Sequence, residues 1–166
     1  MKAARVILIL CFLAACVEVA VRYATLPPWM ASQFGAGGEP KSSMAKPNFF
    51  ALFLGMQLFL VVLFVALPRW LGRLPVNLPH RDYWLAPERR AETLARIERE
   101  MLWMGVATQI FFLVVQHEVI EANVHRGPLS DRFSTYLVLY LAYTVLWTWL
   151  FVVYFWRKPK ASASQG

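Results

Sequence analysis

Four apolar runs, separated by charged segments, constrain the fold of this chain more than any other feature of its sequence. The runs cover residues 6–22, 49–67, 101–121 and 135–156. Each is close to the ~20 residues that an α-helix needs to cross ~30 Å of hydrocarbon. In lipid, only helices and closed barrels satisfy all of their backbone hydrogen bonds. We therefore predict an all-α integral membrane bundle of four transmembrane helices.

Composition supports a membrane protein. The chain has 166 residues, of which 58% are hydrophobic and 16% charged, and ordinary globular domains are less apolar. The net charge of +7 is typical of some nucleic-acid-binding proteins, but the basic residues flank the apolar runs and form no separate basic domain. We predict one membrane domain over residues 1–160, a flexible tail over 161–166, and the lipid bilayer rather than nucleic acid as partner.

The basic residues also predict the orientation. Loops on one side of the expected bundle carry twelve Lys and Arg residues, and loops on the other side carry five. The larger set is Lys2, Arg5, Arg69, Arg73, Arg81, Arg89, Arg90, Arg96, Arg99, Arg157, Lys158 and Lys160, and the smaller set is Arg22, Lys41, Lys46, Arg126 and Arg132. The positive-inside rule then places both termini in the cytoplasm. The loops 22–48 and 122–132 face outward.

A cytoplasmic amphipathic helix is expected between the second and third spans. Pro68 ends the second span, because proline lacks a backbone donor. Pro87 suits the first turn of the next helix, and Glu88 complements its dipole. Leu94 and Ile97 then continue at helical spacing. This helix either turns into the third span or runs straight into it.

The polar block between the second and third spans resembles a known motif. The residues that carry the likeness are Asn77, Pro79, Arg81, Tyr83, Trp84, Pro87, Glu88 and Arg89. The first outer loop adds Leu26-Pro27, Gln33-Phe34, Gly38-Glu39-Pro40 and Met44-Ala45-Lys46. Both segments resemble the bacterial SdpI-like family, named for the immunity protein against the sporulation-delaying toxin. The resemblance implies a small multi-span protein of the bacterial inner membrane. Some relatives give immunity to a secreted toxin, most have no assigned activity, and the resemblance does not imply catalytic residues. The family's outer loop usually has a histidine where this chain has Gln33.

The end of the third run carries a polar cluster. His117 to Glu121 reads HExxE, which differs by one residue from the helical zinc motif with two histidines. Because a match of five residues is weak, His117 and Glu121 are only weak candidates for metal ligands. Glu18 at the outer end of the first run and His125 could supply further ligands. The alternative is a polar helix end, or a hydrogen-bonded network that joins the first and third spans. The candidate ligand-binding residues are Glu18, Gln33, Lys46, His117, Glu118 and Glu121.

Residues Leu13 to Cys16 have the form of a bacterial lipoprotein cleavage site. Processing there would remove the first span and leave a lipidated Cys16. The family resemblance retains this helix, and we expect the span to be kept.

The sequence therefore favours a non-enzymatic binding or accessory protein that acts through its outer loop and requires no cofactor. Its partner would be a membrane protein or an extracytoplasmic peptide. One alternative is a structural subunit of a larger complex, with Trp147 and Trp149 at a protein interface. Another is a membrane metalloenzyme that uses the HExxE segment.

Overall fold

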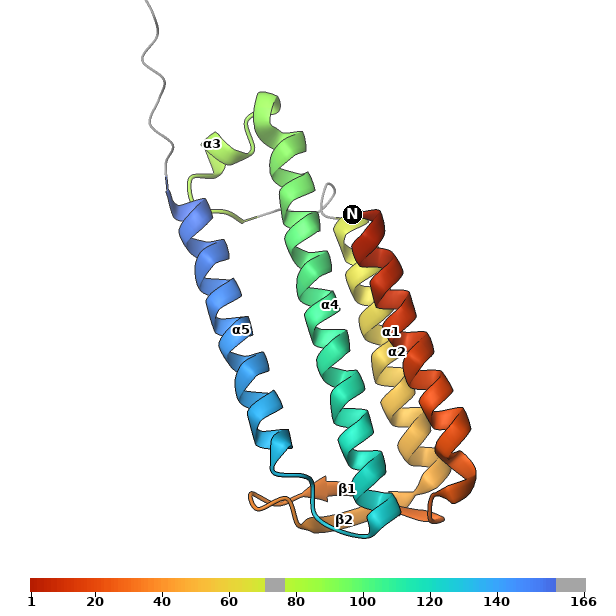
Figure 1. Ribbon diagram of the computed structural model, residues 1–166. Helices are drawn as coiled ribbons and strands as arrows, with labels where there is room; N and C mark the ends of the chain where they lie inside the picture. The colour runs from red at the N-terminus through yellow and green to blue at the C-terminus, as the bar shows by residue number, and fades with distance from the viewer. Residues whose placement is uncertain (71–76, 158–166) are drawn as a thin grey trace, which may run out of the picture.

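The computed structural model describes residues 1–70 and 77–157, and its four long helices lie side by side (Figure 1). They are α1 (Lys2–Arg22), α2 (Lys46–Trp70), α4 (Pro87–His125) and α5 (Arg132–Trp156). All four are long and apolar enough to cross a membrane. The elements at their ends are η1 (Tyr23–Thr25), β1 (Trp29–Phe34), β2 (Pro40–Ala45) and α3 (Arg81–Trp84). The expected tail 161–166, Arg73, Lys158 and Lys160 lie outside the described residues.

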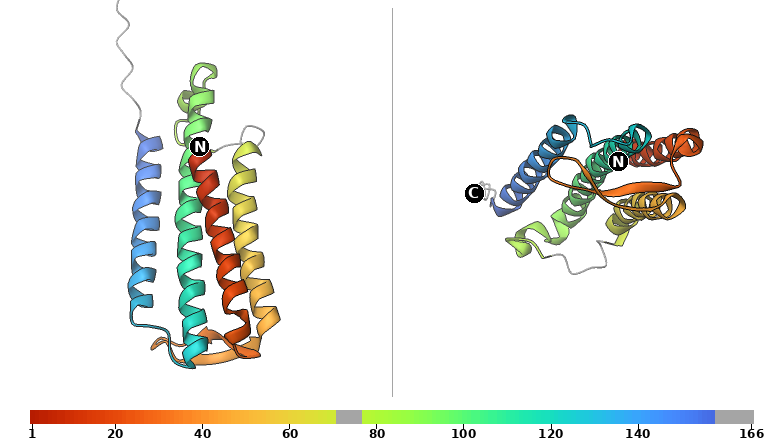
Figure 2. Two further views of the ribbon diagram at one scale, coloured as in Figure 1. Left: turned by 45° about the vertical axis from the view of Figure 1, so that its right-hand side comes forward. Right: turned by 90° about the horizontal axis from the view of Figure 1, so that it is seen from below.

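Helices α1, α2 and α4 pack against one another, and α5 packs on the side of α4 (Figure 2). One apolar cluster joins Ala4 and Leu8 of α1 to Leu102 and Val106 of α4. Beside it, α2 and α4 come unusually close at Gly105. A Cβ added to this glycine would lie 2.5 Å from the ring of Phe64, so no side chain fits there without movement. These contacts form the three-helix core of the bundle.

Strands β1 and β2 pair antiparallel into a hairpin across one end of the bundle, which we call the hairpin end. The chain is mostly helical, as the all-α prediction expects, and the hairpin in the first loop is the part that this prediction did not include. The hairpin reverses at Gly38, whose φ of +79° is a conformation that glycine adopts without steric cost. Met30 of β1 is fully buried, in a cluster with Phe50, Val119 and other apolar residues. Burial of Met30 attaches the hairpin to the helices.

Helix α4 is a single helix of 39 residues. At 1.5 Å per residue it is about 58 Å long, nearly twice the thickness of the hydrocarbon layer. The helix expected from Pro87 is thus the first part of α4 and runs straight into the third apolar run. At its other end α4 continues beyond Glu121 to His125. We call the end of the bundle near α3 the α3 end.

Helix α2 passes through Pro68 and ends at Trp70, although we expected Pro68 to end it. Proline removes the hydrogen bond to the carbonyl four residues earlier and crowds that carbonyl, and α2 continues for only two residues beyond it.

Helix α5 is mostly exposed, and Phe155 is its only buried residue. Large apolar side chains cover its outer surface, including Val138, Val145 and Trp149, each more than 60% exposed. Soluble monomers rarely expose a continuous apolar face of this size. The four apolar helices fit a multi-pass membrane protein, in which lipid or a partner covers this face.

A candidate binding site at the hairpin end

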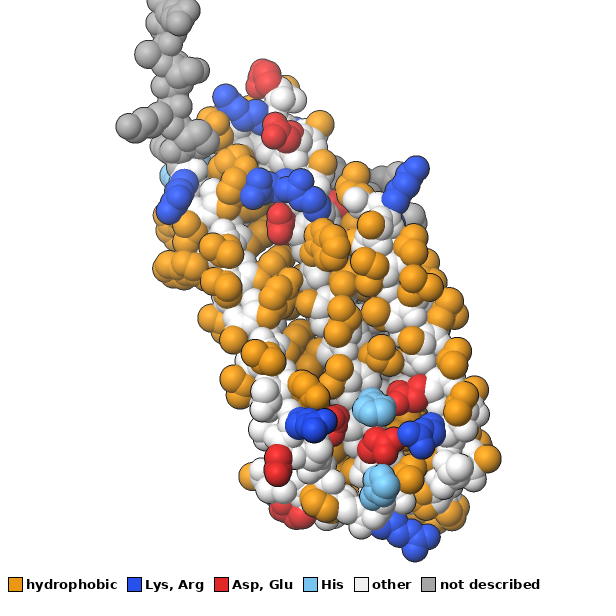
Figure 3. Space-filling model, in the orientation of Figure 1, with side chains coloured by type: hydrophobic (Ala, Val, Ile, Leu, Met, Phe, Trp, Pro, Cys, Tyr) orange, Lys and Arg blue, Asp and Glu red, His pale blue; other side chains and the backbone are white. Residues whose placement is uncertain are grey.

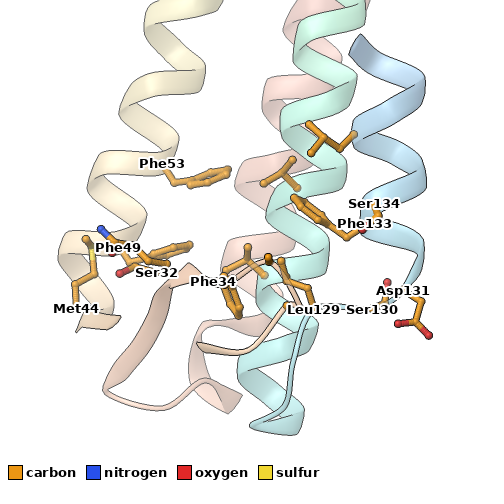
Figure 4. Close-up of a pocket in the computed structure, with 18 of the residues that line it drawn as sticks. Ser32, Phe34, Met44, Phe49, Phe53, Leu129, Ser130, Asp131, Phe133 and Ser134 are labelled. Atoms are coloured by element: carbon orange, nitrogen blue, oxygen red, sulfur yellow. The ribbon is translucent and has the colours of Figure 1, made fainter. Parts of the chain in front are cut away.

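A pocket of about 740 Å³ lies at the hairpin end, between α2, α4 and α5 (Figure 4). Its walls are apolar and come from all three helices: Phe49, Leu52 and Phe53 of α2, Val115 and Val119 of α4, and Phe133 and Leu137 of α5. The volume lies within the range of small-molecule sites in proteins. The pocket is therefore large enough for a ligand with a substantial apolar body.

Polar groups line the rim of this pocket. They come from the hairpin, with Ser32, Gln33 and the turn 35–38, from the segment before α5, with Ser130 and Asp131, and from the first turn of α5, with Ser134. The amide of Leu129 donates a hydrogen bond to the carbonyl of Gly38 at 2.9 Å, which connects the hairpin turn to the segment before α5. The site thus offers apolar walls together with hydrogen-bonding groups at one edge.

Asn123 fixes the hairpin to α4, a role that we did not expect from the sequence. Its Oδ1 accepts a hydrogen bond from the amide of Ala31 at 2.6 Å, and its Nδ2 donates to the carbonyl of Ala31 at 3.1 Å. A third hydrogen bond runs from Nδ2 to the carbonyl of Val119. The side chain therefore pairs with β1 as a neighbouring strand would. A lone asparagine in an expected loop gives no sequence signal for such a contact.

Lys46, which directly follows β2, anchors the open end of the hairpin and does not line the pocket. Its Nζ donates to the carbonyls of Tyr23 and Leu26, both at 2.9 Å, and lies 4.4 Å from the centre of the Tyr23 ring. Lys46 therefore ties the start of α2 to the segment that follows α1. Of the six candidate ligand-binding residues, Gln33 lines the pocket.

A buried polar network joins α1, α2 and α4 just inside the hairpin end. Gln57 and Gln116 have no exposed surface, and the Nε2 of Gln57 donates to the Oε1 of Gln116 at 2.8 Å. The Nε2 of Gln116 donates to the Oε2 of Glu18 and to the carbonyl of Ala15, both at 3.0 Å. Gln116 is thus the central residue of the network.

The network continues to the surface through the HExxE segment. The Nδ1 of His117 lies 2.6 Å from the Oε1 of Glu18. Glu121 forms an ion pair with Arg22, and its second oxygen lies 3.3 Å from the Nε2 of His125. Figure 3 shows charged and histidine side chains gathered here, below a broad apolar band.

Glu118 accepts a hydrogen bond from the hydroxyl of Ser130 at the pocket rim. Within residues 1–70 and 77–157, no three His, Cys, Asp or Glu side chains are grouped so that they could hold a metal ion. The carboxylates of Glu18 and Glu121 are instead bonded to side chains of neighbouring residues. These bonds join α1 to α4, which is the arrangement of the hydrogen-bonded network that we considered as the alternative to a metal site.

The polar motif after α2 lies at the α3 end, far from the pocket. The indole Nε1 of Trp84 donates to the carbonyl of Phe155 at 2.8 Å, and Thr93 donates to the carbonyl of Trp84. Trp84 also packs edge-on against the ring of Phe155. These contacts brace α3 and the beginning of α4 against the last turn of α5.

Comparisons of this chain with family models, with curated proteins and with solved structures gave no match. The resemblance to the SdpI-like family stays a prediction from the two sequence motifs.

Proposed function

We propose that this chain is a multi-pass protein of the bacterial cytoplasmic membrane, with its termini and the α3 end inside and the hairpin end outside. The excess of Lys and Arg in the segments at the α3 end supports this orientation. The exposed apolar surfaces of the four helices support residence in lipid.

We propose further that it is a non-enzymatic binding protein, similar in role to SdpI-like immunity proteins. The pocket between α2, α4 and α5 is the observation that carries this proposal. Its apolar walls suit an apolar peptide side chain or segment, and its polar rim suits the hydrogen-bonding groups of an extracytoplasmic peptide. The hairpin, held by Asn123 and Lys46, would form the outer boundary of the site.

Filling the pocket tests this function. Leu137→Trp places a bulky ring in the pocket wall, whereas Leu139→Trp makes the same change on the exposed face of α5. Each variant would be expressed in a deletion strain at equal membrane abundance, and survival would be measured in culture fluid from toxin-secreting bacteria. We expect Leu137→Trp to lose protection and Leu139→Trp to retain it. Full protection by Leu137→Trp would refute pocket binding.

Metal analysis tests the enzymatic alternative. Purified protein would be analysed for zinc beside the variants His117→Ala and Glu121→Gln. We expect neither stoichiometric zinc in the unmodified chain nor any change in metal content in the variants. Stoichiometric zinc that either substitution abolishes would favour a metalloenzyme and contradict our proposal.

The exposed face of α5 favours a second candidate, a structural subunit of a larger membrane complex. Trp149 is 65% exposed on this face, while Trp147 stacks on Phe151 and is only partly exposed. If this face binds a protein, Leu139→Trp should disrupt a complex that survives purification in mild detergent. In that case Leu139→Trp, rather than Leu137→Trp, would abolish function.

A further inference from the structure

A second cavity lies at the α3 end, between α3, α4 and α5, and is separate from the hairpin-end pocket. Its volume is about 220 Å³. Arg89 and Arg96 of α4 line it, together with Tyr83 of α3 and Tyr154 of α5. Arg89 and Arg96 are seven positions apart, which is two turns of helix, so both lie on the same side of α4.

Both arginines are held by aromatic rings. The guanidinium carbon of Arg89 lies 4.0 Å from the centre of the Tyr83 ring, and that of Arg96 lies 3.5 Å from the centre of the Tyr154 ring. Stacking on a ring orients a guanidinium and leaves the N–H donors at its edge available. The two side chains are thus ordered without losing their ability to bind an anion.

Neither arginine is paired with a carboxylate in the part of the chain that the structure describes. Glu92 also lines the cavity, so two guanidinium groups share the site with one carboxylate. The cavity keeps an excess positive charge.

A third cavity, of about 190 Å³, adjoins the second and shares Arg96, Tyr154 and Phe155 with it. It continues along α5 past apolar side chains that include Leu150 and Phe151. Its one acidic residue, Glu100, forms an ion pair with Arg99. The indole nitrogen of Trp147, also in its wall, is buried without a hydrogen-bond partner.

The two cavities together form a groove with a positively charged end and an apolar end. Basic pockets between transmembrane helices on the cytoplasmic side are suited to anionic lipid headgroups. We propose that this groove binds one anionic phospholipid, with its phosphate at Arg89 and Arg96 and an acyl chain along Leu150 and Phe151. A bound lipid would also add to the contacts that already join α5 to α3 and α4 at this end.

Lipid binding would be measured on the purified full-length chain in neutral detergent, by native mass spectrometry and thermal unfolding. Phosphatidylglycerol, phosphatidylcholine and inorganic phosphate are the three probes. We expect one retained phosphatidylglycerol that raises the melting temperature, and at least tenfold weaker retention of phosphatidylcholine. Equal retention of both lipids would overturn the proposal. Displacement of phosphatidylglycerol by an equal concentration of inorganic phosphate would assign the site to free anions and also overturn it.

Charge variants separate this site from general electrostatic attraction. The double variant Arg89→Gln with Arg96→Gln should weaken phosphatidylglycerol binding roughly 30-fold, since each basic residue near an anionic surface strengthens binding about fivefold. The control, Lys41→Gln with Arg132→Gln, removes the same charge from exposed positions at the hairpin end and should change little. The double variant Arg89→Lys with Arg96→Lys keeps both positive charges and should retain part of the affinity for phosphatidylglycerol. It shows whether a loss of binding in the glutamine variant comes from the lost charge or from misfolding. Unchanged affinity in the glutamine double variant, or equal losses in it and the control, would refute the site.

Discussion

Asn123→Ala should weaken the attachment of the hairpin to the bundle, because this one side chain bonds both peptide groups of Ala31. Asn123 is 5% exposed, so water does not readily replace the lost hydrogen bonds. A net hydrogen bond contributes about 1 kcal/mol, and a buried group left unsatisfied costs about 1 to 3 kcal/mol. Two lost bonds to β1 therefore correspond to about 2 kcal/mol. The third bond, to Val119, lies within α4 and does not hold the hairpin.

A loss of about 2 kcal/mol raises the equilibrium constant for local opening roughly 30-fold. Hydrogen exchange followed by mass spectrometry, on full-length protein in detergent, measures this constant for peptides that contain β1. We expect β1 to exchange about 30 times faster in Asn123→Ala, while α1 and α2 keep their rates. The near-isosteric Asn123→Asp keeps an oxygen for the amide of Ala31 but loses the donor to its carbonyl, so its effect should be intermediate. Unchanged exchange in β1 of Asn123→Ala would show that burial of Met30 alone holds the hairpin.

Three further predictions concern the helices. Gly105→Ala should lower thermal stability by about 1 to 3 kcal/mol through overpacking, while Gly55→Ala, whose Cβ would meet open space, should be neutral or slightly stabilising. Both would be compared by thermal unfolding in the same detergent, and equal stabilities would contradict the close packing of α2 and α4. Gln116→Leu should cost about 1 to 3 kcal/mol because it leaves buried polar partners unsatisfied, and a stability equal to that of the unmodified chain would show that water replaces it. With both native cysteines removed, Lys41→Cys in intact cells should react with an impermeant thiol reagent and Arg89→Cys should not; the reverse labelling would invert our topology.

The candidate site shows where sequence reasoning reached its limit. HExxE spacing drew attention to His117 and Glu121, because residues four apart share a helix face, and these side chains do lie in a polar cluster with Glu18. The pocket, however, is lined by phenylalanine, leucine and valine from three helices. In a sequence such residues cannot be distinguished from core or lipid-facing positions. Of the candidate residues, Gln33 lines the pocket. The residues next to it in the sequence do not indicate which helices form the opposite walls.

The sequence by itself determined the number, order and approximate limits of the four long helices. A run of about 20 apolar residues has essentially one solution in lipid, since only a helix satisfies every backbone group within the run. Only the tertiary structure decided the hairpin, the continuity of α4 and the position of the pocket. The hairpin depends on Asn123 and Ala31, 92 positions apart. The pocket depends on how α2, α4 and α5 are spaced around it, and contacts between segments so distant leave no local pattern of residues.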